Sequence, residues 1–265
     1  MHESVNRAGA VTGENDVVIR IEDLRRSFDG FPVLQGISLE VGKGVLLALI
    51  GRSGCGKSVL LRHMAGLLRP DSGQVFIRDM DVARVKGRAL ARLRQGLGFL
   101  FQGGALFDSM TVYDNVAFPL REKTRMREAE IRQRVVDELG RVGLSGAEGK
   151  YPSQLSGGMQ KRAALARELV CEPEIMLFDE PTTGLDPIIG HAILKLIDDL
   201  HRKMRFTGII VTHELHKVFE IVDRVALLHE GGIRVQGPPE DILSSEDALV
   251  RQFVRGEIEG PISVR

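Results

Sequence analysis

A glycine-rich pattern, G-x-x-x-x-G-K-[ST], is formed by Gly51-Arg52-Ser53-Gly54-Cys55-Gly56-Lys57-Ser58. The apolar run Val45–Ile50 precedes it, and the helix-like segment Val59–Ala65 follows it. This order of strand, glycine loop and helix lets backbone N–H groups surround a polyphosphate, with the positive end of the helix behind them. Lys57 supplies a charge for the β- and γ-phosphates, and the Ser58 hydroxyl is an oxygen ligand suited to Mg²⁺. The stretch predicts a site for a nucleoside triphosphate.

The composition favours one globular unit. The chain has 265 residues and 43% hydrophobic content, enough for one sizeable core with or without a satellite subdomain. Lys+Arg and Asp+Glu are both 36, so no positive surplus gathers nucleic acid, and we expect no nucleic-acid partner. The apolar runs are far shorter than the roughly 20 residues of a spanning helix, so we expect no membrane crossing by this chain alone. Its two cysteines, Cys55 and Cys171, exclude a disulfide framework and favour a reducing cytoplasm.

The first third of the chain is predicted to be rich in strands. Residues 1–16 are polar and without period, which is typical of a flexible leader. Residues 17–22 and 37–41 alternate apolar with polar side chains and are joined by the turn signal Asp29-Gly30, so they predict antiparallel strands. Residues 74–78 alternate too and are expected in the same sheet.

The remainder alternates helices with strands. From Lys86 to about Val170 the periods are helical, which predicts a helical insert. Residues 175–178 and 209–212 are short apolar runs separated by a helix that begins with Asp186 as N-cap and Pro187 at its first position. This order predicts a parallel α/β core, followed by a closing hairpin over residues 225–228 and 233–236.

Two further motifs carry chemistry. The run 175–178 ends in Asp179 and Glu180, which are either solvated acids capping a buried strand or, beside a phosphate loop, a Mg²⁺ ligand and a residue that polarises water. The segment LSGGM contains Ser156, Gly157 and Gly158 before a helix. It is either a flexible turn or an anion-binding nest.

Together with Gln102 after an aromatic segment and Thr212-His213 after a strand, these motifs resemble the ATP-binding cassette (ABC) ATPases. The resemblance covers about residues 17–237. It implies an α/β P-loop NTPase fold, an ABC-type nucleotide-binding domain with an antiparallel β subdomain and a helical subdomain. We expect this domain over residues 17–240, with the helical subdomain at about 103–168, and a C-terminal extension over 241–265 as a candidate dimer or subunit contact.

The resemblance also implies a role for each matching residue. Two copies close head to tail around ATP and Mg²⁺, so that the Ser156–Gly158 nest of one copy meets the γ-phosphate held by Lys57 of the other. The implied catalytic residues are Glu180, His213 and Gln102, and the implied metal-binding residues are Ser58, Gln102 and Asp179. The implied nucleotide-binding residues are Phe28, Gly51, Arg52, Ser53, Gly54, Cys55, Gly56, Lys57, Ser58, Ser156, Gly157, Gly158 and Asp186.

Two positions depart from the family pattern. Phe28 stands where an aromatic residue, often Tyr, stacks on adenine, and the missing hydroxyl removes at most one hydrogen bond. Met159 replaces the common Gln of LSGGQ, which removes a polar contact but leaves Ser156, Gly157 and Gly158 in place. We therefore expect activity to be retained.

A narrower resemblance concerns residues 101–122, FQGGALFDSMTVYDNVAFPLRE, and the segment 250–261. Both look like the ATPases of bacterial lipid transporters built with MCE-domain proteins, including the Mla type that maintains outer-membrane lipid asymmetry. This implies phospholipid transport, a peripheral place on the cytoplasmic face of the inner membrane, and four partners. They are a second copy, an MlaE-like integral-membrane permease, an MlaD-like MCE subunit and a small STAS-type subunit like MlaB.

The alternatives are the ATPase of a small-solute importer, a soluble cassette acting on ribosomes or DNA, and a module without turnover. The soluble cassettes usually carry two cassettes in one chain or long coiled insertions, which this sequence lacks. A module without turnover would have lost Glu180 or His213, and both are present.

Four local features remain, and two of them have two interpretations each. Leu106, Phe107, Val112, Val116 and Phe118 form either an apolar groove for a partner's short helix or internal packing. The run 121–128 is expected to be a mixed, solvated helix face. His63 and His201 are expected to be satisfied or solvated residues rather than site residues. The tail, Glu246–Arg265, with Leu249, Phe253 and Ile258, is either a frayed end or a contact to a neighbouring ATPase copy or small subunit.

Overall fold

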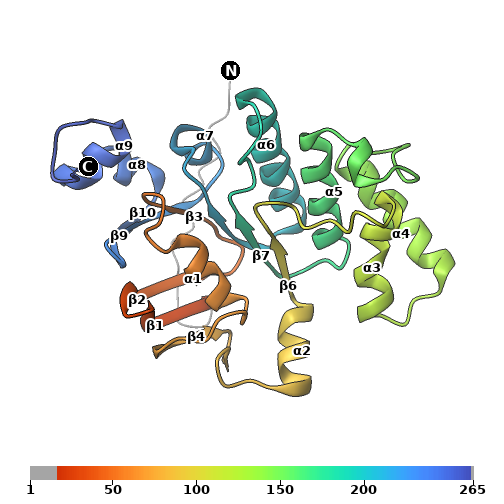
Figure 1. Ribbon diagram of the computed structural model, residues 1–265, viewed down its shortest axis with the longest axis horizontal. Coiled ribbons are helices and arrows are strands. Elements are labelled where there is room, and N and C mark those ends of the chain that lie inside the picture. Colours follow the sequence, from red (N-terminus) through yellow and green to blue (C-terminus); the bar gives the residue numbers. More distant parts are fainter. Residues whose placement is uncertain (1–16, 264–265) are drawn as a thin grey trace. The chain divides into compact units, whose positions relative to one another are not determined.

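The computed structural model describes residues 17–263, so the leader predicted for residues 1–16 lies outside the described residues (Figure 1). The chain divides into two compact units. The first comprises the residues up to Val85 and those from Val211 onward, and the second comprises Lys86–Ile210. The domain boundaries expected from the sequence, 17–240 and about 103–168, stay predictions.

The first unit contains an antiparallel sheet with strand order β2-β1-β4-β5. Strands β1 (Val17–Phe28) and β2 (Phe31–Gly42) are joined by Asp29-Gly30, and both turn residues have positive φ, 49° and 82°. That geometry matches the twist of a two-residue hairpin, which confirms the predicted turn. Both strands are longer than their alternating cores suggested. Strand β4 (Ser72–Ile77) pairs with β1 as predicted, and the two-residue β5 (Met80–Asp81) closes the edge.

A second group of strands in this unit carries the glycine loop. Strand β3 (Leu46–Ile50) is wholly buried and runs parallel to β9 (Arg224–His229), which forms the predicted hairpin with β10 (Gly232–Gly237). The Asp223 carboxylate accepts the Leu46 amide at 2.7 Å, and the Asp223 amide donates to the Leu46 carbonyl at 2.9 Å. These bonds align the start of β3. The helices of the unit are α1 (Lys57–Met64), α7 (Leu215–Phe219), α8 (Pro239–Leu243) and α9 (Ala248–Arg255).

The second unit contains the strands β6 (Leu97–Leu100), β7 (Ile175–Asp179) and β8 (Thr207–Val211), in the order β8-β7-β6. Strands β6 and β7 are parallel, as expected for the core. The expectation of helix from Lys86 to about Val170 was wrong at β6. All four of its residues are buried, and a run this short has no measurable period, so its apolar pattern does not separate strand from helix. Helix α2 (Gly87–Gln95) precedes it.

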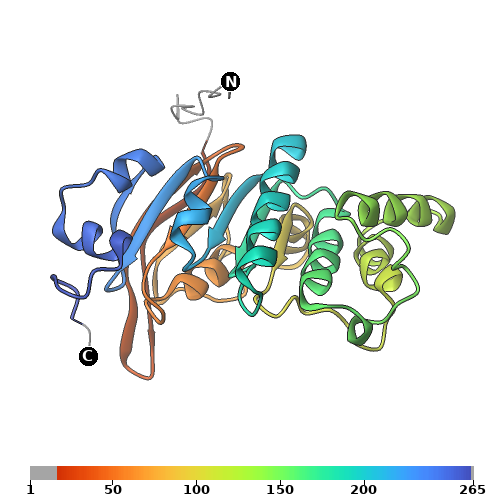
Figure 2. The same ribbon diagram turned by 90° about the horizontal axis from the view of Figure 1, so that it is seen from above.

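Helices dominate the rest of the second unit. Helices α3 (Val112–Lys123), α4 (Glu128–Arg141) and α5 (Gly157–Leu169), with the short 3₁₀ helix η2 (Pro152–Gln154), form the green group in Figure 2. Helix α4 buries Ile131, Val135 and Leu139 at four-residue steps, in agreement with the helical period expected over this part of the chain. Helix α6 (Pro187–Met204) begins at Pro187, with Asp186 as its N-cap. The sequence predicted both features correctly.

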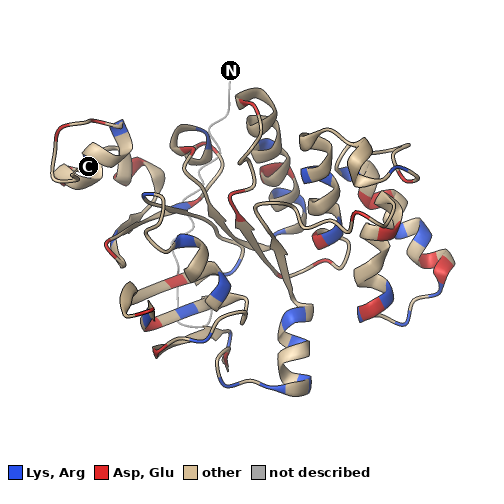
Figure 3. Ribbon diagram, in the orientation of Figure 1, with Lys and Arg blue, Asp and Glu red and all other residues tan. Residues whose placement is uncertain are grey.

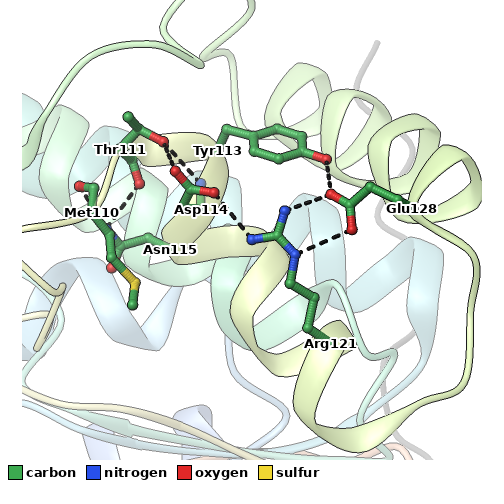
Figure 4. A network of polar contacts seen from close by, with 7 residues as sticks. All are labelled: Met110, Thr111, Tyr113, Asp114, Asn115, Arg121 and Glu128. Carbon is green, nitrogen blue, oxygen red and sulfur yellow. Dashed lines mark hydrogen bonds and ion pairs between the residues drawn. The ribbon is translucent and has the colours of Figure 1, made fainter.

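The expectation of one solvated helix face over residues 121–128 was wrong. Helix α3 ends at Lys123 and α4 begins at Glu128, so the run spans a helix end, a loop and a helix start. Arg121 joins the two helices, because its guanidinium donates to Asp114 at 3.1 Å and also to the Glu128 carboxylate (Figure 4). Tyr113 donates to the same carboxylate at 3.2 Å. The charges therefore hold α3 against α4.

Three other properties follow from the side chains. His63 is buried with its Nδ1 2.8 Å from the Val59 carbonyl, and His201 is buried against the ring of Phe206, so both are packing residues. Basic and acidic residues are interspersed over the ribbons, but the charged residues of α2 are all arginines: Arg88, Arg92 and Arg94 (Figure 3). Within residues 17–263, every helix lacks the length and apolar content required to cross a bilayer.

Candidate active site

The phosphate loop in the first unit has the backbone geometry that its glycines predicted. Gly51 and Gly56 have φ of 153° and 105°. A Cβ on Gly51 would lie 2.4 Å from the Leu228 carbonyl oxygen, and one on Gly56 would lie 2.8 Å from Leu34. Only glycine fits at these two positions. The loop then enters α1, whose first residue is Lys57 and whose second is Ser58.

Lys57 is 5% exposed and is folded onto its own loop. Its Nζ donates to the carbonyls of Gly51 and Arg52, both at 2.8 Å. The Arg52 carbonyl also accepts the Cys55 amide at 3.3 Å. Neutral carbonyl acceptors thus hold the ammonium group at the phosphate loop. A phosphate would accept stronger hydrogen bonds from it than these carbonyls do, because those bonds are charge-assisted.

Cys55 is the partly buried cysteine of the loop. Burial raises the pKa of its thiol, and the positive charge of Lys57 offsets this only in part. The side chain therefore behaves as a small neutral group at pH 7, and a neutral group adds no negative charge where a polyphosphate binds.

His213 lies near the phosphate loop in the same unit. It follows β8 and lines a cavity of about 520 Å³ together with the first residues of the loop, the residues of α7 and the end of α9. From the loop these are Gly51, Arg52 and Ser53. The neighbouring turn is fixed by Thr212, whose buried hydroxyl accepts the Glu214 amide at 3.0 Å.

Phe28 ends β1 and is 37% exposed. The Arg26 guanidinium carbon lies 4.7 Å from the centre of its ring, a cation–π arrangement. Arg26 is itself fixed by Asp71 at 2.6 Å. The ring is thus held in place with much of its surface open, which suits stacking on a purine.

In the second unit, the parallel register of β6 and β7 brings two predicted residues together. Leu100 pairs with Phe178, so the two strands end side by side. The segment after β6 leads to Gln102, and the end of β7 leads to Asp179 and Glu180. Gln102 donates from Nε2 to the Glu180 carboxylate at 3.0 Å. Thr183 donates to the same carboxylate oxygen at 2.8 Å. Asp179 is 4% exposed at the end of β7.

The backbone of Glu180 is strained. Its φ is 48°, in the left-handed region that costs a residue with a side chain roughly 1–3 kcal/mol. The turn is closed by the Thr183 amide, which donates to the Glu180 carbonyl at 3.2 Å. The carboxylate of this residue is the one that accepts the hydrogen bond from Gln102.

Two basic residues of α5 complete this group, and the sequence analysis missed both. Lys161 is 6% exposed and donates to the Gln102 carbonyl. Burial lowers its pKa, while the charge of Glu180 raises it. Arg167 is 8% exposed and donates to the carbonyls of Gly104 and Ala105, at 3.0 and 2.6 Å. The pair fixes the segment that carries Gln102. The sequence signal that could have identified them is the presence of basic residues on an otherwise apolar helix face, where a buried charge needs a partner.

The residues Ser156, Gly157 and Gly158 start α5 as predicted. The Ser156 hydroxyl caps the helix by accepting the Met159 amide at 3.4 Å. Asp186 is exposed, and its Oδ1 accepts the Ile188 and Ile189 amides at 3.0 and 3.1 Å. Both side chains therefore already serve as helix caps, and their remaining exposed surface is available to another molecule.

The predicted residues thus form two groups. In the first unit lie Phe28, the loop Gly51–Ser58 and His213, and in the second lie Gln102, Ser156–Gly158, Asp179, Glu180 and Asp186. Residues 34–183, which include the phosphate loop, LSGGM and the strand ending in Glu180, match the family described as ABC transporter. The chain belongs to the ABC transporter family. As an ABC ATPase, it binds and hydrolyses ATP.

Curated relatives agree with this membership. The chain is 42% identical over 248 residues to the probable ribonucleotide transport ATP-binding protein mkl of Mycobacterium leprae, covering 94% of this chain and 72% of that one. It is 40% identical over 248 residues to the intermembrane phospholipid transport system ATP-binding protein MlaF of Haemophilus influenzae, covering 94% of both chains. It is 42% identical to the methionine import ATP-binding protein MetN of Mesorhizobium japonicum, covering 91% and 66%.

Solved structures of ABC proteins share the fold. The structure of cbiO1 from Clostridium perfringens, part of the transporter complex cbiONQ, has a TM-score of 0.79 and 32% identity, covering 91% of this ABC ATPase and 96% of that chain. A dimeric structure of the ATP-binding cassette MJ0796 bound to ADP and phosphate has a TM-score of 0.77 and 29% identity, covering 83% and 98%. These likenesses confirm the predicted fold class.

Proposed function

We propose that this ABC ATPase powers a bacterial transporter that moves phospholipids between membranes, of the Mla type. The observation that supports this most is the 40% identity with the phospholipid transport protein MlaF, which spans 94% of each chain. A match of this length must include the helical segment 101–122, which carries the narrower resemblance.

We assign the chemistry of hydrolysis to Glu180. Its carboxylate accepts hydrogen bonds from Gln102 and Thr183, so it is oriented for a further partner, and a water molecule between it and the γ-phosphate would be polarised for attack. Gln102 places this carboxylate and senses the water. His213 contacts the γ-phosphate and orients Glu180.

ATP is held by the phosphate loop, residues Gly51 to Ser58, and by stacking of adenine on Phe28. Mg²⁺ is a hard ion that takes oxygen ligands, and the oxygens that would hold it are the Ser58 hydroxyl, the buried Asp179 carboxylate and the Gln102 amide oxygen. When bound, Mg²⁺ neutralises charge that develops on the phosphates. Lys57 supplies a second positive charge at the same phosphates.

A second copy of the chain would complete the site. The dimeric cassette bound to ADP and phosphate supports this, and so do the exposed positions of Ser156, Gly157 and Asp186. The amide groups at the start of α5 would bind the γ-phosphate held by the other copy. Asp186 would cross the dimer interface.

The transporter also needs a membrane partner, and we propose the segment 106–118 as its docking surface. The structure separates four of the five apolar residues of this segment into two sets, and the fifth, Leu106, is half-buried. Val112 and Val116 are fully buried, whereas Phe107 and Phe118 are 43% and 36% exposed and meet edge to face with ring centres 5.1 Å apart. Asn115, fully buried, holds the loop by accepting the Phe107 amide at 2.8 Å and donating to the Phe107 and Met110 carbonyls.

The partners proposed are an MlaE-like permease at this surface, an MlaD-like MCE subunit and an MlaB-like STAS subunit. The proposed location is the cytoplasmic face of the inner membrane. The C-terminal extension, residues 241–265, is proposed as a contact to another subunit. The second candidate function is import of a small solute, which the 42% identity to the methionine import protein favours.

Purification from native membranes separates the two candidates. The tagged chain is isolated in mild detergent, and its bound subunits and lipids are identified by mass spectrometry. Phospholipid and an MCE-domain subunit are expected with the wild-type chain. Recovery of a solute-binding protein without an MCE subunit would instead support the importer. A Leu106→Asp chain serves as the control for subunits that bind without the docking surface.

A further inference from the structure

The last described residues form a strap, residues 256–263, that folds back on α9 of the same chain, as the dark blue ends of Figure 1 and Figure 2 show. Gln252 of α9 holds the strap. Gln252 is 3% exposed. Its Nε2 donates to the Ile262 carbonyl at 3.0 Å, and its Oε1 accepts the Ile262 amide at 2.7 Å. The interpretation of this tail as a frayed end was therefore wrong for the residues described.

The strap fits Gln252 closely. A Cβ on Gly260 would lie 2.5 Å from both Cδ and Oε1 of Gln252, and the φ of Gly260 is 152°. The Glu257 amide donates to the Gln252 carbonyl at 3.1 Å, and Ile262 is only 8% exposed. A buried amide group is tolerated only when its donors and acceptors are paired. If the strap undocked, the Gln252 side chain would lose the partners that pair its amide.

The far end of the strap reaches the phosphate loop. Arg52 donates from Nη1 to the Ser263 carbonyl at 3.2 Å. The Arg52 carbonyl in turn accepts Lys57 Nζ at 2.8 Å and the Cys55 amide at 3.3 Å. Hydrogen bonds and the covalent backbone therefore connect Gln252 to Lys57, through Ile262 and Ser263 of the strap and through Arg52. All of these residues belong to the first unit.

A cavity separates α9 from the phosphate loop beside this connection. It measures about 520 Å³ and is lined by Arg52 and Ser53 on one side and by Phe253 to Gly256 on the other. The strap connects the two groups of lining residues through the hydrogen bond between Arg52 and Ser263. The Arg52 side chain is otherwise exposed.

We propose that the strap regulates the phosphate loop, because strap docking on Gln252 and nucleotide binding at Lys57 favour each other. A docked strap fixes Arg52 and so removes conformational freedom that the loop would otherwise lose when nucleotide binds. Linkage then requires the reverse effect, that bound nucleotide tightens the strap by the same factor. This inference needs only nucleotide binding by the chain and does not depend on lipid as the transported molecule.

The test compares two variants of the full chain. Gly260→Ala places a methyl group against Gln252 and should displace the strap, whereas Ile258→Ala changes a strap residue that is 81% exposed. The affinity for ADP is measured by calorimetry. Since one exposed hydrogen bond connects strap and loop, Gly260→Ala should weaken ADP binding by roughly 3–10-fold, and Ile258→Ala should leave it unchanged.

Hydrogen exchange measures the reverse effect. In the wild-type chain, ADP should slow exchange of the Ile262 amide by about the factor that Gly260→Ala costs in affinity. In Arg52→Ala, ADP should no longer change exchange at Ile262. A chain that ends at Ile258 repeats the affinity measurement if Gly260→Ala fails to fold.

The proposal is overturned if ADP leaves exchange at Ile262 unchanged in the wild-type chain, or if Ile258→Ala weakens ADP binding as much as Gly260→Ala. An affinity for ADP that is unchanged in both Gly260→Ala and the shortened chain would also overturn it. These outcomes differ from failure of the proposed transport function, in which lipid and permease are absent but ADP and the strap remain coupled.

Discussion

Gln102 Nε2 lies 3.0 Å from the carboxylate of Glu180, although 78 positions separate the two residues in the chain. The contact exists because β6 and β7 run parallel and end together. In parallel sheets, the carboxyl ends of the strands are where ligands and catalytic groups gather. The hydrogen bond fixes the position of the Gln102 amide relative to the carboxylate that we propose as catalytic.

Glu180→Gln should abolish turnover and spare binding. The amide keeps the shape of the side chain and a partner for Thr183, but it cannot act as a base, so the rate of ATP hydrolysis should fall by about 10²-fold or more with ATP affinity retained. Phosphate release and nucleotide binding are measured on the same preparation. Near-normal turnover would show that another group activates water.

Lys57→Ala is the contrasting variant. It removes a charge-assisted phosphate contact and the two hydrogen bonds that close the loop, so ATP affinity itself should fall. Calorimetric titration with ATP checks this. If binding survived at the wild-type level while hydrolysis stopped, the assignment of Lys57 to the ground-state phosphates would be wrong.

Leu106→Asp should detach the chain from its membrane complex and leave its fold intact. Leu106 borders the exposed Phe107, and a carboxylate there would need an aqueous partner that an apolar docking helix does not provide. Ser109→Asp, an exposed position in the same loop, is the matched control for added charge. Affinity purification measures the yield of membrane subunits. Equal yields from the two variants would mean that the exposed aromatic pair only packs the helical segment.

Cys55 should be alkylated slowly, and only at high pH. Burial raises the pKa of its thiol above the ordinary range of about 8.5, so the thiolate is scarce at pH 7. In a Cys171→Ser background, the rate of reaction with iodoacetamide should still be rising past pH 8.5, and ATP should suppress it. A rate that levels off below pH 8 would indicate an activated thiol.

Glu138→Gln should stabilise the protein at neutral pH. Glu138 is 2% exposed, its Oε1 has no hydrogen-bond partner, and burial raises its pKa. The folded state therefore binds the proton more tightly than the unfolded state does. The contribution of this group is fully favourable below the unfolded pKa of about 4.3 and is lost as the pH rises through the folded pKa.

The expected result is a higher melting temperature at pH 7, by roughly 2–4 °C, and a smaller change at pH 4. The partner Arg141 is 51% exposed, so its lost ion pair costs little. Asp137→Asn, at the exposed neighbouring position, controls for removal of a charge and should change little. Destabilisation by Glu138→Gln at pH 7 would mean that the ion pair with Arg141 outweighs burial.

Sequence alone predicted what depends on local chemistry. The phosphate loop, the helix that starts after LSGGM, the Asp186 cap and the Asp29-Gly30 hairpin each follow from a short pattern whose backbone requirement is strict. The family resemblance extended this to the roles of residues far apart in the chain.

The features that escaped prediction depend on tertiary packing. Strand β6 is too short to show a period. The role of the basic residues Lys161 and Arg167 is visible only in the folded chain, where they donate to carbonyls of the segment that carries Gln102. The run 121–128 has a helical composition, but the ion pairs of Arg121 link two helices. Each of these outcomes is set by neighbours distant in sequence, which a one-dimensional pattern does not contain.

Because the backbone of Glu180 is left-handed, a replacement that stabilises the fold at this position is expected to lower activity. Glycine or asparagine adopts φ near 48° at lower cost than glutamate, so either replacement relieves strain while removing the carboxylate that we propose as catalytic. A screen of this chain for heat resistance alone would therefore enrich inactive proteins at position 180. Engineering for durability has to hold this residue fixed and seek its gains elsewhere in the fold.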